Sequence, residues 1–484
     1  MTRLRLAASD TFSSLRTRNF RLFFAGQLVS QTGTWMQSVA LVWVVLDLTG
    51  DGVALGLVVA AQFLPVLVLG AWGGVVADRV DRHFMMIGTQ LAFTALAVAF
   101  SMLTLTGTAT VGAIYALSLL FGIINALDNP SRRALVTELV ALRDVPNAVG
   151  LNSAVMTGSR VVGPAVAGAL IAGPGAGWTF VANAVSYLFV IGALLRMDRS
   201  QLRPSPRVAR AKGQLREGLR YAWRTPEMRL PIVLVAVIGT LTFEYQVSLP
   251  LLAERTFEGT ATTFTLLFST MSAGSVAGAL AVARRSRIDL AFLLRAGGWL
   301  AAASVALALA PTLAVAVAAS VAVGFSSIAL ISGSNAVVQL EADPAMRGRV
   351  LALLSVVFLG STPIGGPIVG WVSELAGPRA GVLVGAVAAA GAVAWTVRQR
   401  RALDTGTPPT GRAAAPVPTP DGASAPPVPA VAGAEATVPL PDRTPAAVPL
   451  DDRSPATAPK VGRGTDTPCG PSGDAEDERP ATAA

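Results

Sequence analysis

Two ionisable side chains lie within long apolar runs of the chain, where a charge is costly. Arg160 is in the run from Val149 to Ile171, and Glu244 is in the run from Leu230 to Leu252. At about 1.5 Å per helical residue, Arg160 lies ~16 Å and Glu244 ~21 Å along its run, near the middle of a bilayer. A charge there costs ~2.5–3.5 kcal/mol unless it faces protein or water. We therefore predict a central ion pair or a shared aqueous cavity, with packing against backbone carbonyls as the structural alternative.

Further polar side chains lie in or beside the same apolar runs. Asp128 is close to Arg132 and Arg133, so it is a candidate either for a structural salt bridge or for proton transfer. Amide side chains can line a polar cavity, but in membranes they also join helices through hydrogen bonds. Five amides are cavity candidates with this alternative open: Gln27, Gln31, Gln62, Asn125 and Asn335.

The composition argues against several kinds of chemistry. Cys469 is the single cysteine and His83 the single histidine, so disulfides within the chain, thiolate clusters and two-histidine sites are excluded, and we expect no metal or other cofactor. The sequence contains neither a phosphate-binding loop with its lysine nor a nucleophile elbow, which argues against direct use of ATP and against an enzyme. Arginines dominate the net charge of +9 but lie in separate loops, so nucleic acid is not an expected partner.

Membrane helices must position these residues. Of the 484 residues, 52% are hydrophobic and 14% are charged, against about 25% charged in soluble domains. Apolar runs of about 20 residues, enough to cross ~30 Å of hydrocarbon, recur along the chain. We predict an all-α polytopic membrane protein with twelve transmembrane helices in two pseudo-symmetric six-helix halves. The predicted spans are Leu22–Leu46, Val53–Val76, Met85–Leu105, Thr108–Leu127, Val149–Ile171, Trp178–Leu195, Leu230–Leu252, Thr262–Val282, Leu290–Ala310, Leu313–Ile331, Val350–Val372 and Ala380–Val397.

The distribution of arginines predicts the orientation. They precede the first span and follow spans 2, 4, 8, 10 and 12, and only Arg255 and Arg379 depart from this alternation. Lys and Arg accumulate in cytoplasmic loops, so we predict a multi-pass protein of the inner (cytoplasmic) membrane with both termini in the cytoplasm. The predicted segments are an arm at 1–21, six-helix halves at 22–195 and 230–401, a cytoplasmic linker at 196–229 and a tail at 402–484.

The linker and the tail have distinctive compositions. In the linker, Leu215, Leu219, Ala222 and Trp223 share one helical face, which predicts an amphipathic helix lying on the inner leaflet, with a solvated charged helix as the alternative. The tail is rich in Pro, Ala and Thr with few large apolar residues, so we predict that it is disordered.

A charged pattern follows the second predicted span. Gly74 is followed by Asp78, Arg79, Asp81 and Arg82 in the arrangement G-x-x-x-D-R-x-x-R, which resembles the signature of the major facilitator superfamily of transporters. The small residue Gly74 allows close helix contact. The resemblance implies that Asp78, Arg79 and Arg82 hold a cytoplasmic gate shut in the outward-facing state, whereas charges at a helix end can also serve topology alone.

The fifth span carries a second pattern, GSRVVGPAVAG, which contains Arg160, Gly163, Pro164 and Gly168. It resembles the glycine and proline motif of the superfamily's drug/proton antiporters. Glycine permits close helix approach, and proline bends a helix where one half rocks against the other. Span 11 repeats the pattern as GGPIVG from Gly365, which is typical of duplicated halves.

The resemblance extends over residues ~16 to ~400 and is closest to the branch that includes the enterobactin exporter and related actinobacterial efflux proteins. The sequences DNPSR from Asp128 and EGLRYAWRTPE in the linker carry it. It implies a secondary active transporter in the lipid bilayer. We expect a monomeric, proton-coupled exporter of a drug-like or siderophore-like small molecule, working by alternating access. A nutrient importer and a non-transporting membrane sensor are the alternatives. The segment from Gly278 to Arg285 lacks an acid, which predicts a weaker gate contact in the second half.

Overall fold

The computed structural model describes residues 12–203, 214–285 and 287–404. Several predicted features lie outside this described part: the tail from residue 405, the first eleven residues of the arm, the middle of the linker, and the side chains of Leu215 and Asp78.

In the described residues, the chain is helical and contains no strand. The first half consists of η1 (Ser13–Arg16), α2 (Arg18–Thr49), α3 (Gly52–Arg79), α4 (Arg82–Leu105), α5 (Val111–Glu138), η2 (Leu142–Asp144), α6 (Val145–Ala172), α7 (Ala176–Leu195) and η3 (Arg199–Gln201). The linker contains the helix α8 (Gln214–Arg224). The second half consists of α9 (Pro226–Leu241), α10 (Tyr245–Leu251), the π-helical turn η4 (Leu252–Thr256), α11 (Ala261–Ala283), α12 (Leu290–Ala308), α13 (Leu313–Glu341), α14 (Arg347–Ala376) and α15 (Pro378–Asp404).

Most of these helices have the length and composition of membrane spans. In the described chain, eleven segments are long and apolar enough to cross a bilayer, with α9, α10 and η4 counted as one. The predicted first span, α2, is less apolar because it carries amides such as Gln27, Gln31 and Gln37, yet it is 32 residues long and packs against α6 and α7. With α2 as a further span, the structure confirms the predicted all-α, two-half membrane fold.

Several helices extend beyond the apolar runs that predicted them, and α13 for example continues past Ile331 to Glu341. α3 continues through Arg79, and α5 continues past Leu127 to Glu138 with Pro130 inside it, so the predicted loop that begins at Asp128 is helical. The prediction was wrong here because hydropathy reports the thickness of the hydrocarbon, whereas helical hydrogen bonding continues through polar residues beyond it.

The predicted span from Leu230 to Leu252 is not one continuous helix. α9 ends at Leu241, α10 begins at Tyr245, and Glu244 is the N-cap residue between them. Non-helical backbone at membrane depth is tolerated only where it is buried in protein or lines a cavity. This break therefore turns the Glu244 side chain away from the course of a regular helix, toward the seam between the halves.

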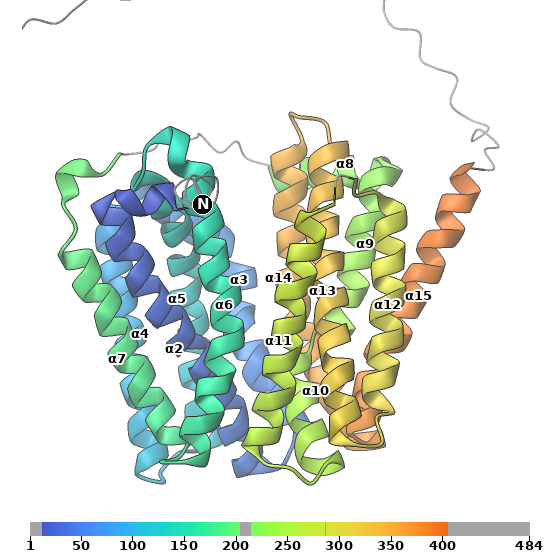
Figure 1. Ribbon diagram of the computed structural model, residues 1–484, viewed down its shortest axis with the longest axis horizontal. Coiled ribbons are helices and arrows are strands. Elements are labelled where there is room, and N and C mark those ends of the chain that lie inside the picture. Colours follow the sequence, from blue (N-terminus) through green and yellow to red (C-terminus); the bar gives the residue numbers. More distant parts are fainter. Residues whose placement is uncertain (1–11, 204–213, 286, 405–484) are drawn as a thin grey trace, which may run out of the picture. The chain divides into compact units, whose positions relative to one another are not determined.

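The two halves meet along paired helices (Figure 1). α3 and α6 of the first half contact α14 and α11 of the second. A Cβ atom on Gly370 would lie 2.1 Å from the carbonyl oxygen of Gly52, and one on Gly56 would lie 2.5 Å from that of Gly366. These four glycines therefore allow the backbones of α3 and α14 to touch at the end of the molecule away from α8, as small residues do at membrane helix interfaces.

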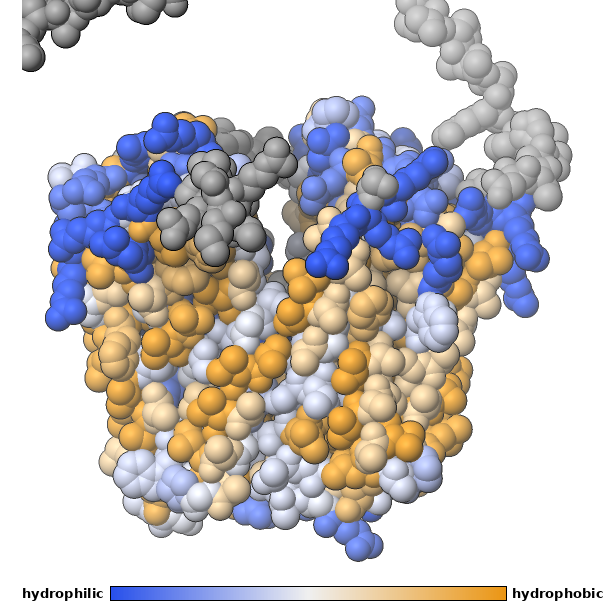
Figure 2. Space-filling view, viewed as in Figure 1, coloured by the Kyte–Doolittle hydropathy of each residue, from blue (hydrophilic) through white to orange (hydrophobic). Residues whose placement is uncertain are grey.

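The surface shows the environment that these helices occupy. Figure 2 shows a broad hydrophobic belt below a hydrophilic end that carries α8, with a hollow between the two halves at that end. Large apolar side chains on the membrane-length helices, such as Val68, Phe189 and Val387, are 60–69% exposed. Contiguous exposed apolar surface of this extent is stable against lipid and not against water.

Candidate functional site

A cavity of about 200 Å³ lies at the seam between the halves. Both halves contribute walls: α2, α3 and α6 from the first, and α11, α13, α14 and the break between α9 and α10 from the second. Six of the lining residues are aromatic, and the two charged ones are the predicted pair, Arg160 and Glu244. The aromatic lining residues are Trp35, Phe63, Phe243, Tyr245, Phe268 and Phe358.

The first half positions Arg160 through close packing of α6 on α2. A Cβ atom on Gly163 would lie 2.6 Å from the Cβ of Trp35 and 2.9 Å from the carbonyl oxygen of Thr32. This contact places the guanidinium carbon of Arg160 4.6 Å from the centroid of the Trp35 ring. The cation is thus held over an aromatic face, which stabilises it through a cation–π interaction. Gly163 of the predicted motif has a structural function in building the site.

The second half positions Glu244 through an equally close contact. A Cβ atom on Gly365 of α14 would lie 1.6 Å from the carbonyl oxygen of Thr240 and 2.9 Å from Oε1 of Glu244. The Glu244 side chain is only 3% exposed, Thr362 lies beside its carboxylate, and Oε1 has no hydrogen-bond partner among the described residues. The repeated glycine motif on α14 therefore borders this carboxylate directly.

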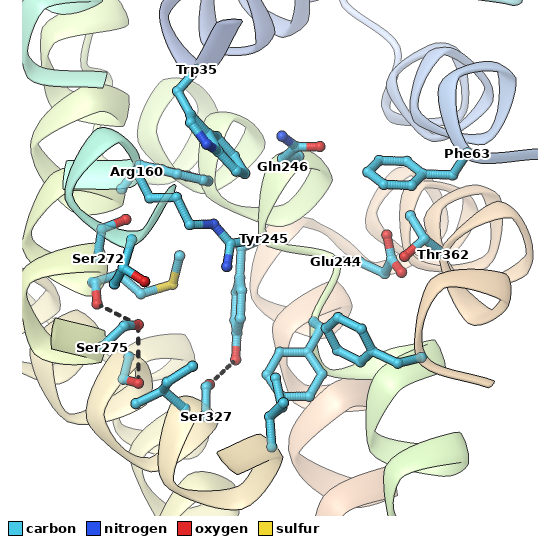
Figure 3. A pocket seen from close by; sticks show the side chains of 18 residues that line it. Trp35, Phe63, Arg160, Glu244, Tyr245, Gln246, Ser272, Ser275, Ser327 and Thr362 are labelled. Carbon is cyan, nitrogen blue, oxygen red and sulfur yellow. Dashed lines mark hydrogen bonds between the residues drawn. The ribbon is translucent and has the colours of Figure 1, made fainter. Parts of the chain in front are cut away.

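The two charged residues share the cavity without forming an ion pair. In Figure 3, the Arg160 side chain extends toward Tyr245, whereas the Glu244 carboxylate points toward Thr362. The Tyr245 hydroxyl is itself 3.1 Å from Oγ of Ser327. Among the described residues, Arg160 and Glu244 make no ion pair with each other or with another residue. This geometry corresponds to the shared-cavity form of the prediction and leaves both charges free to meet a bound molecule.

The predicted amides lie elsewhere. Gln31 donates from Nε2 to Oε1 of Gln27 at 3.2 Å on α2, and Gln62 on α3 is buried. Asn125 accepts a hydrogen bond of 2.9 Å from Asn129 on α5, and Asn335 donates to the carbonyl oxygen of Ile331 at 3.0 Å on α13. None of the five predicted amides lines the central cavity.

Asp128 lies in a buried polar cluster inside the first half. Its side chain is 0% exposed and accepts hydrogen bonds from Thr89 at 2.8 Å and from Gln90 at 3.0 Å, both on α4. Arg132, one helical turn along α5, donates to it from Nε at 3.1 Å and also from Nη2. These four side chains join α4 to α5 away from the cavity, which favours the structural interpretation of Asp128 over proton transfer.

This arrangement makes a prediction about stability. We expect Asp128→Asn to lower the free energy of unfolding by about 3–5 kcal/mol, because it leaves the buried Arg132 cation without its anion. Thermal and denaturant unfolding of the purified protein in detergent would measure the loss. Asp144→Asn is the matched control, since its contact with the largely exposed Arg143 should contribute no more than about 1 kcal/mol. Wild-type stability combined with lost proton coupling in Asp128→Asn would favour proton transfer instead.

The aromatic wall of the cavity was missed from the sequence. Trp35 packs against Phe268 across the seam with ring centroids 6.2 Å apart, and Phe243 packs edge-on to both Tyr245 and Phe358. Aromatic residues are common in membrane helices, and their residue types alone do not reveal which face the seam. The sequence signal that could have indicated this wall is that Phe243 and Tyr245 flank Glu244, a charged residue at membrane depth.

Comparison with known proteins decides the family. Residues 9–414 match the family model described as transmembrane secretion effector, a major facilitator family. The chain therefore belongs to this family. As a major facilitator transporter, it also resembles solved structures of this fold, such as a bacterial homologue of the human lysosomal transporter Spinster in an inward-facing conformation. That comparison has a TM-score of 0.63 and 16% identity, and covers 81% of this chain and 99% of the other.

Curated relatives of the transporter match part or most of its length. The staphyloferrin A transporter of Staphylococcus aureus is 27% identical over 54% of this chain and 66% of its own length. Macrolide efflux protein A of Streptococcus pyogenes is 26% identical over 36% of this chain and 42% of its own length. The multidrug efflux pump Tap of Mycolicibacterium fortuitum is 25% identical over 74% of this chain and 90% of its own length. The matches to the first two therefore span two thirds or less of those relatives.

The charged motif of the transporter lies at the end that carries α8. Asp81 caps α4 by accepting from the backbone N–H of His83 at 2.9 Å, and it pairs with Arg199 at 2.9 Å. Arg82 pairs with Glu138 at the end of α5. Arg79 is exposed and Gly74 is buried, while the neighbouring Gly73 makes the close contact, since a Cβ atom there would lie 2.2 Å from the carbonyl oxygen of Ala126.

The ion pairs of the motif just described therefore join elements of the first half. In the second half, Arg349 at the start of α14 pairs with Glu217 of α8 at 2.7 Å. The linker helix packs on α14 through Gly218 and Ala222, while Leu219 and Trp223 remain 47% and 59% exposed. The predicted apolar face of the linker is thus divided between a protein contact and an exposed stripe suited to a membrane surface.

The opposite end of the transporter is closed by a contact between the halves. Arg255 in η4 pairs with Glu374 of α14 at 2.8 Å and donates to the carbonyl oxygen of Gly50. The same Glu374 carboxylate accepts from the backbone N–H of Gly52 at 2.5 Å. Arg255, an exception to the predicted alternation of arginines, is therefore used to join the halves beside the glycine contact of α3 and α14.

Neutralising this contact should loosen the closed end. The Arg255 and Glu374 side chains are about 30% exposed, so their hydrogen bonds to Gly50 and Gly52 of the first half should together contribute no more than about 1 kcal/mol. We expect Arg255→Gln to shift the equilibrium between closed and open forms of this end up to about fivefold, measured as distances between spin labels on α3 and α14. Arg379→Gln is the matched control, because Arg379 donates to the carbonyl oxygen of Ala310 within the second half. An equal shift in both variants would contradict a role for the Arg255 contact.

Proposed function

We propose that this transporter is a proton-coupled exporter of small amphiphilic molecules, of drug-like or siderophore-like character, in the cytoplasmic membrane. Both termini and α8 lie on the cytoplasmic side, and export proceeds by alternating access. The observation that carries the proposal is the cavity at the seam, which combines six aromatic side chains with one cation and one buried carboxylate. The relatives named for macrolide efflux, multidrug efflux and staphyloferrin A transport support this class of cargo.

The two halves of the protein contribute different chemical groups to the cavity. The Trp35 and Arg160 side chains form a flat aromatic and cationic surface, which suits apolar rings and anionic groups of a substrate. Glu244 lies across the cavity with a carboxylate that has no cation beside it among the described residues. We assign proton exchange to Glu244, because a carboxyl group at a helix break on the seam changes its exposure when the halves rock.

The conformation supports an alternating-access cycle. The end away from α8 is closed by the glycine pairs of α3 and α14, and by the hydrogen bonds from Arg255 to the Gly50 carbonyl and from the Gly52 N–H to Glu374. At the α8 end the molecule is hollowed between the halves (Figure 2), and the described ion pairs of the motif join Arg82 to Glu138 of α5 and Asp81 to Arg199 of η3. We infer that this is the inward-facing state, in which cargo enters from the cytoplasm. Rocking about the seam would then pair the motif charges with the second half.

Transport into vesicles of known sidedness tests the proposal. Inside-out vesicles with an acidic lumen model export, and the probes are erythromycin, ethidium and staphyloferrin A. We expect at least one probe to accumulate inside, and nigericin, which collapses the pH gradient, to abolish the accumulation. Uptake confined to right-side-out vesicles would identify an importer. Absence of proton release from the lumen during accumulation of a probe would refute proton coupling.

A further inference from the structure

A groove of about 490 Å³ lies on the second half, separate from the central cavity. It is formed between α12 and α13, with Arg285 from the turn after α11 at one end. Its floor consists of small side chains, and two large aromatic side chains stand beside them: Trp299 is 70% exposed and Phe325 is 41% exposed. The small floor residues are Ala296, Ala318, Ala322, Ser326 and Ala329.

Two cations mark the end of the groove nearest α8. Arg285 lies with its guanidinium carbon 4.9 Å from the centroid of Phe292, and Arg295 is exposed one helical turn before Trp299. Neither arginine has an ion pair or hydrogen bond to the described chain. The nearest acid in sequence, Asp289, accepts from the backbone N–H of Phe292 and caps α12. The groove therefore presents unpaired positive charge at the boundary of the hydrophobic belt.

The groove has the depth of one leaflet. On α13, the lining residues run from Ala329 to Ala318, which is about 16 Å at ~1.5 Å per residue. Half of a ~30 Å hydrocarbon core has the same thickness. The groove thus begins with cations at the headgroup level and continues as an apolar channel to the middle of the membrane, where its mostly small, apolar floor suits a hydrocarbon chain.

We propose that this groove binds an anionic phospholipid of the leaflet on the α8 side, with its phosphate between Arg285 and Arg295 and one acyl chain along α13. Guanidinium groups form charge-assisted hydrogen bonds to phosphate oxygens, and basic pockets between membrane helices suit such headgroups. The lipid bound here tethers α12 and α13 from outside, and it has no contact with the transported molecule.

Fluorescence quenching at Trp299 tests the site in the purified full-length protein in a neutral maltoside detergent. The probes are phosphatidylglycerol and phosphatidylcholine with the same brominated acyl chains. We expect saturable quenching by phosphatidylglycerol at concentrations roughly tenfold or more below those needed for phosphatidylcholine, because two cations contact the anionic headgroup. The saturable component should disappear in Trp299→Phe, which assigns it to this one of the eight tryptophans.

Charge variants separate the groove from general attraction to a basic surface. Arg285→Gln combined with Arg295→Gln should weaken phosphatidylglycerol binding roughly tenfold or more, while the corresponding lysine pair should retain it. Arg284→Gln with Arg287→Gln is the control, because these exposed arginines lie in the same turn and do not line the groove. Equal quenching by both lipids, or an equal loss in the control pair, would overturn the proposal. Competition by soluble glycerol phosphate alone, at the same concentration, would show a phosphate site without a lipid and would also overturn it.

Discussion

Glu244→Gln abolishes proton-driven transport and leaves the protein folded, if Glu244 is the proton-exchanging group. Glutamine keeps the shape of the side chain but cannot release or take up a proton in the cavity. We therefore expect accumulation in inside-out vesicles to fall to the level of vesicles without the protein. Binding of the same probe in detergent should persist, because the aromatic wall and Arg160 are unchanged. Parallel measurements of lumenal pH would show that proton release is lost together with accumulation.

Glu227→Gln provides the matched control for this loss. Glu227 is on α9, the helix that leads to the break at Glu244, but it is exposed in the first turn of that helix and does not line the cavity. Transport should be unchanged in that variant. A Glu244→Gln protein that still accumulates substrate against a pH-dependent gradient would exclude Glu244 as the proton carrier. The unpaired Arg160 would then be better explained by direct substrate binding coupled to another ion.

Gly370→Leu prevents the two halves from closing at the end away from α8. A Cβ atom alone would lie 2.1 Å from the carbonyl oxygen of Gly52, so a leucine forces α14 away from the backbone of α3. We expect the protein to remain folded, to favour the form open at that end, and to lose transport almost completely, because alternating access needs both forms.

Cysteine labelling measures the direction of opening. In a Cys469→Ser background, Ser327→Cys places a thiol on the cavity wall. A membrane-impermeant maleimide should label it from the α8 side in the parent protein and from the opposite side in Gly370→Leu. Gly391→Leu is the control, since a Cβ atom at Gly391 meets nothing within 4 Å. Unchanged labelling and transport in Gly370→Leu would contradict the closing role of the glycine contact.

Much of the fold could be predicted because lipid imposes a simple rule on sequence. A segment that crosses hydrocarbon must satisfy its own backbone hydrogen bonds and present apolar side chains to lipid. The spans and the charges of the loops can therefore be recognised from short stretches of sequence. The motif residues Gly163 and Gly365 were recognisable for the same reason, since close helix approach requires a missing side chain wherever it occurs. The charged residues at membrane depth, Arg160 and Glu244, were conspicuous because a charge at the centre of a membrane helix is costly.

Only the tertiary structure decided which of these residues belong together. The faces of membrane helices are mostly apolar, and small differences in shape determine which of them pack together. The sequence therefore did not show that Trp35 lines the seam, whereas Gln31 forms a hydrogen bond within its own helix. It likewise did not reveal that the helix breaks at Glu244, because that break is stabilised by α14 packing against the Thr240 carbonyl from more than one hundred residues away. The sequence by itself determined a lipid-embedded helical bundle with two costly charges, and contacts between distant helices decided that these charges face one cavity.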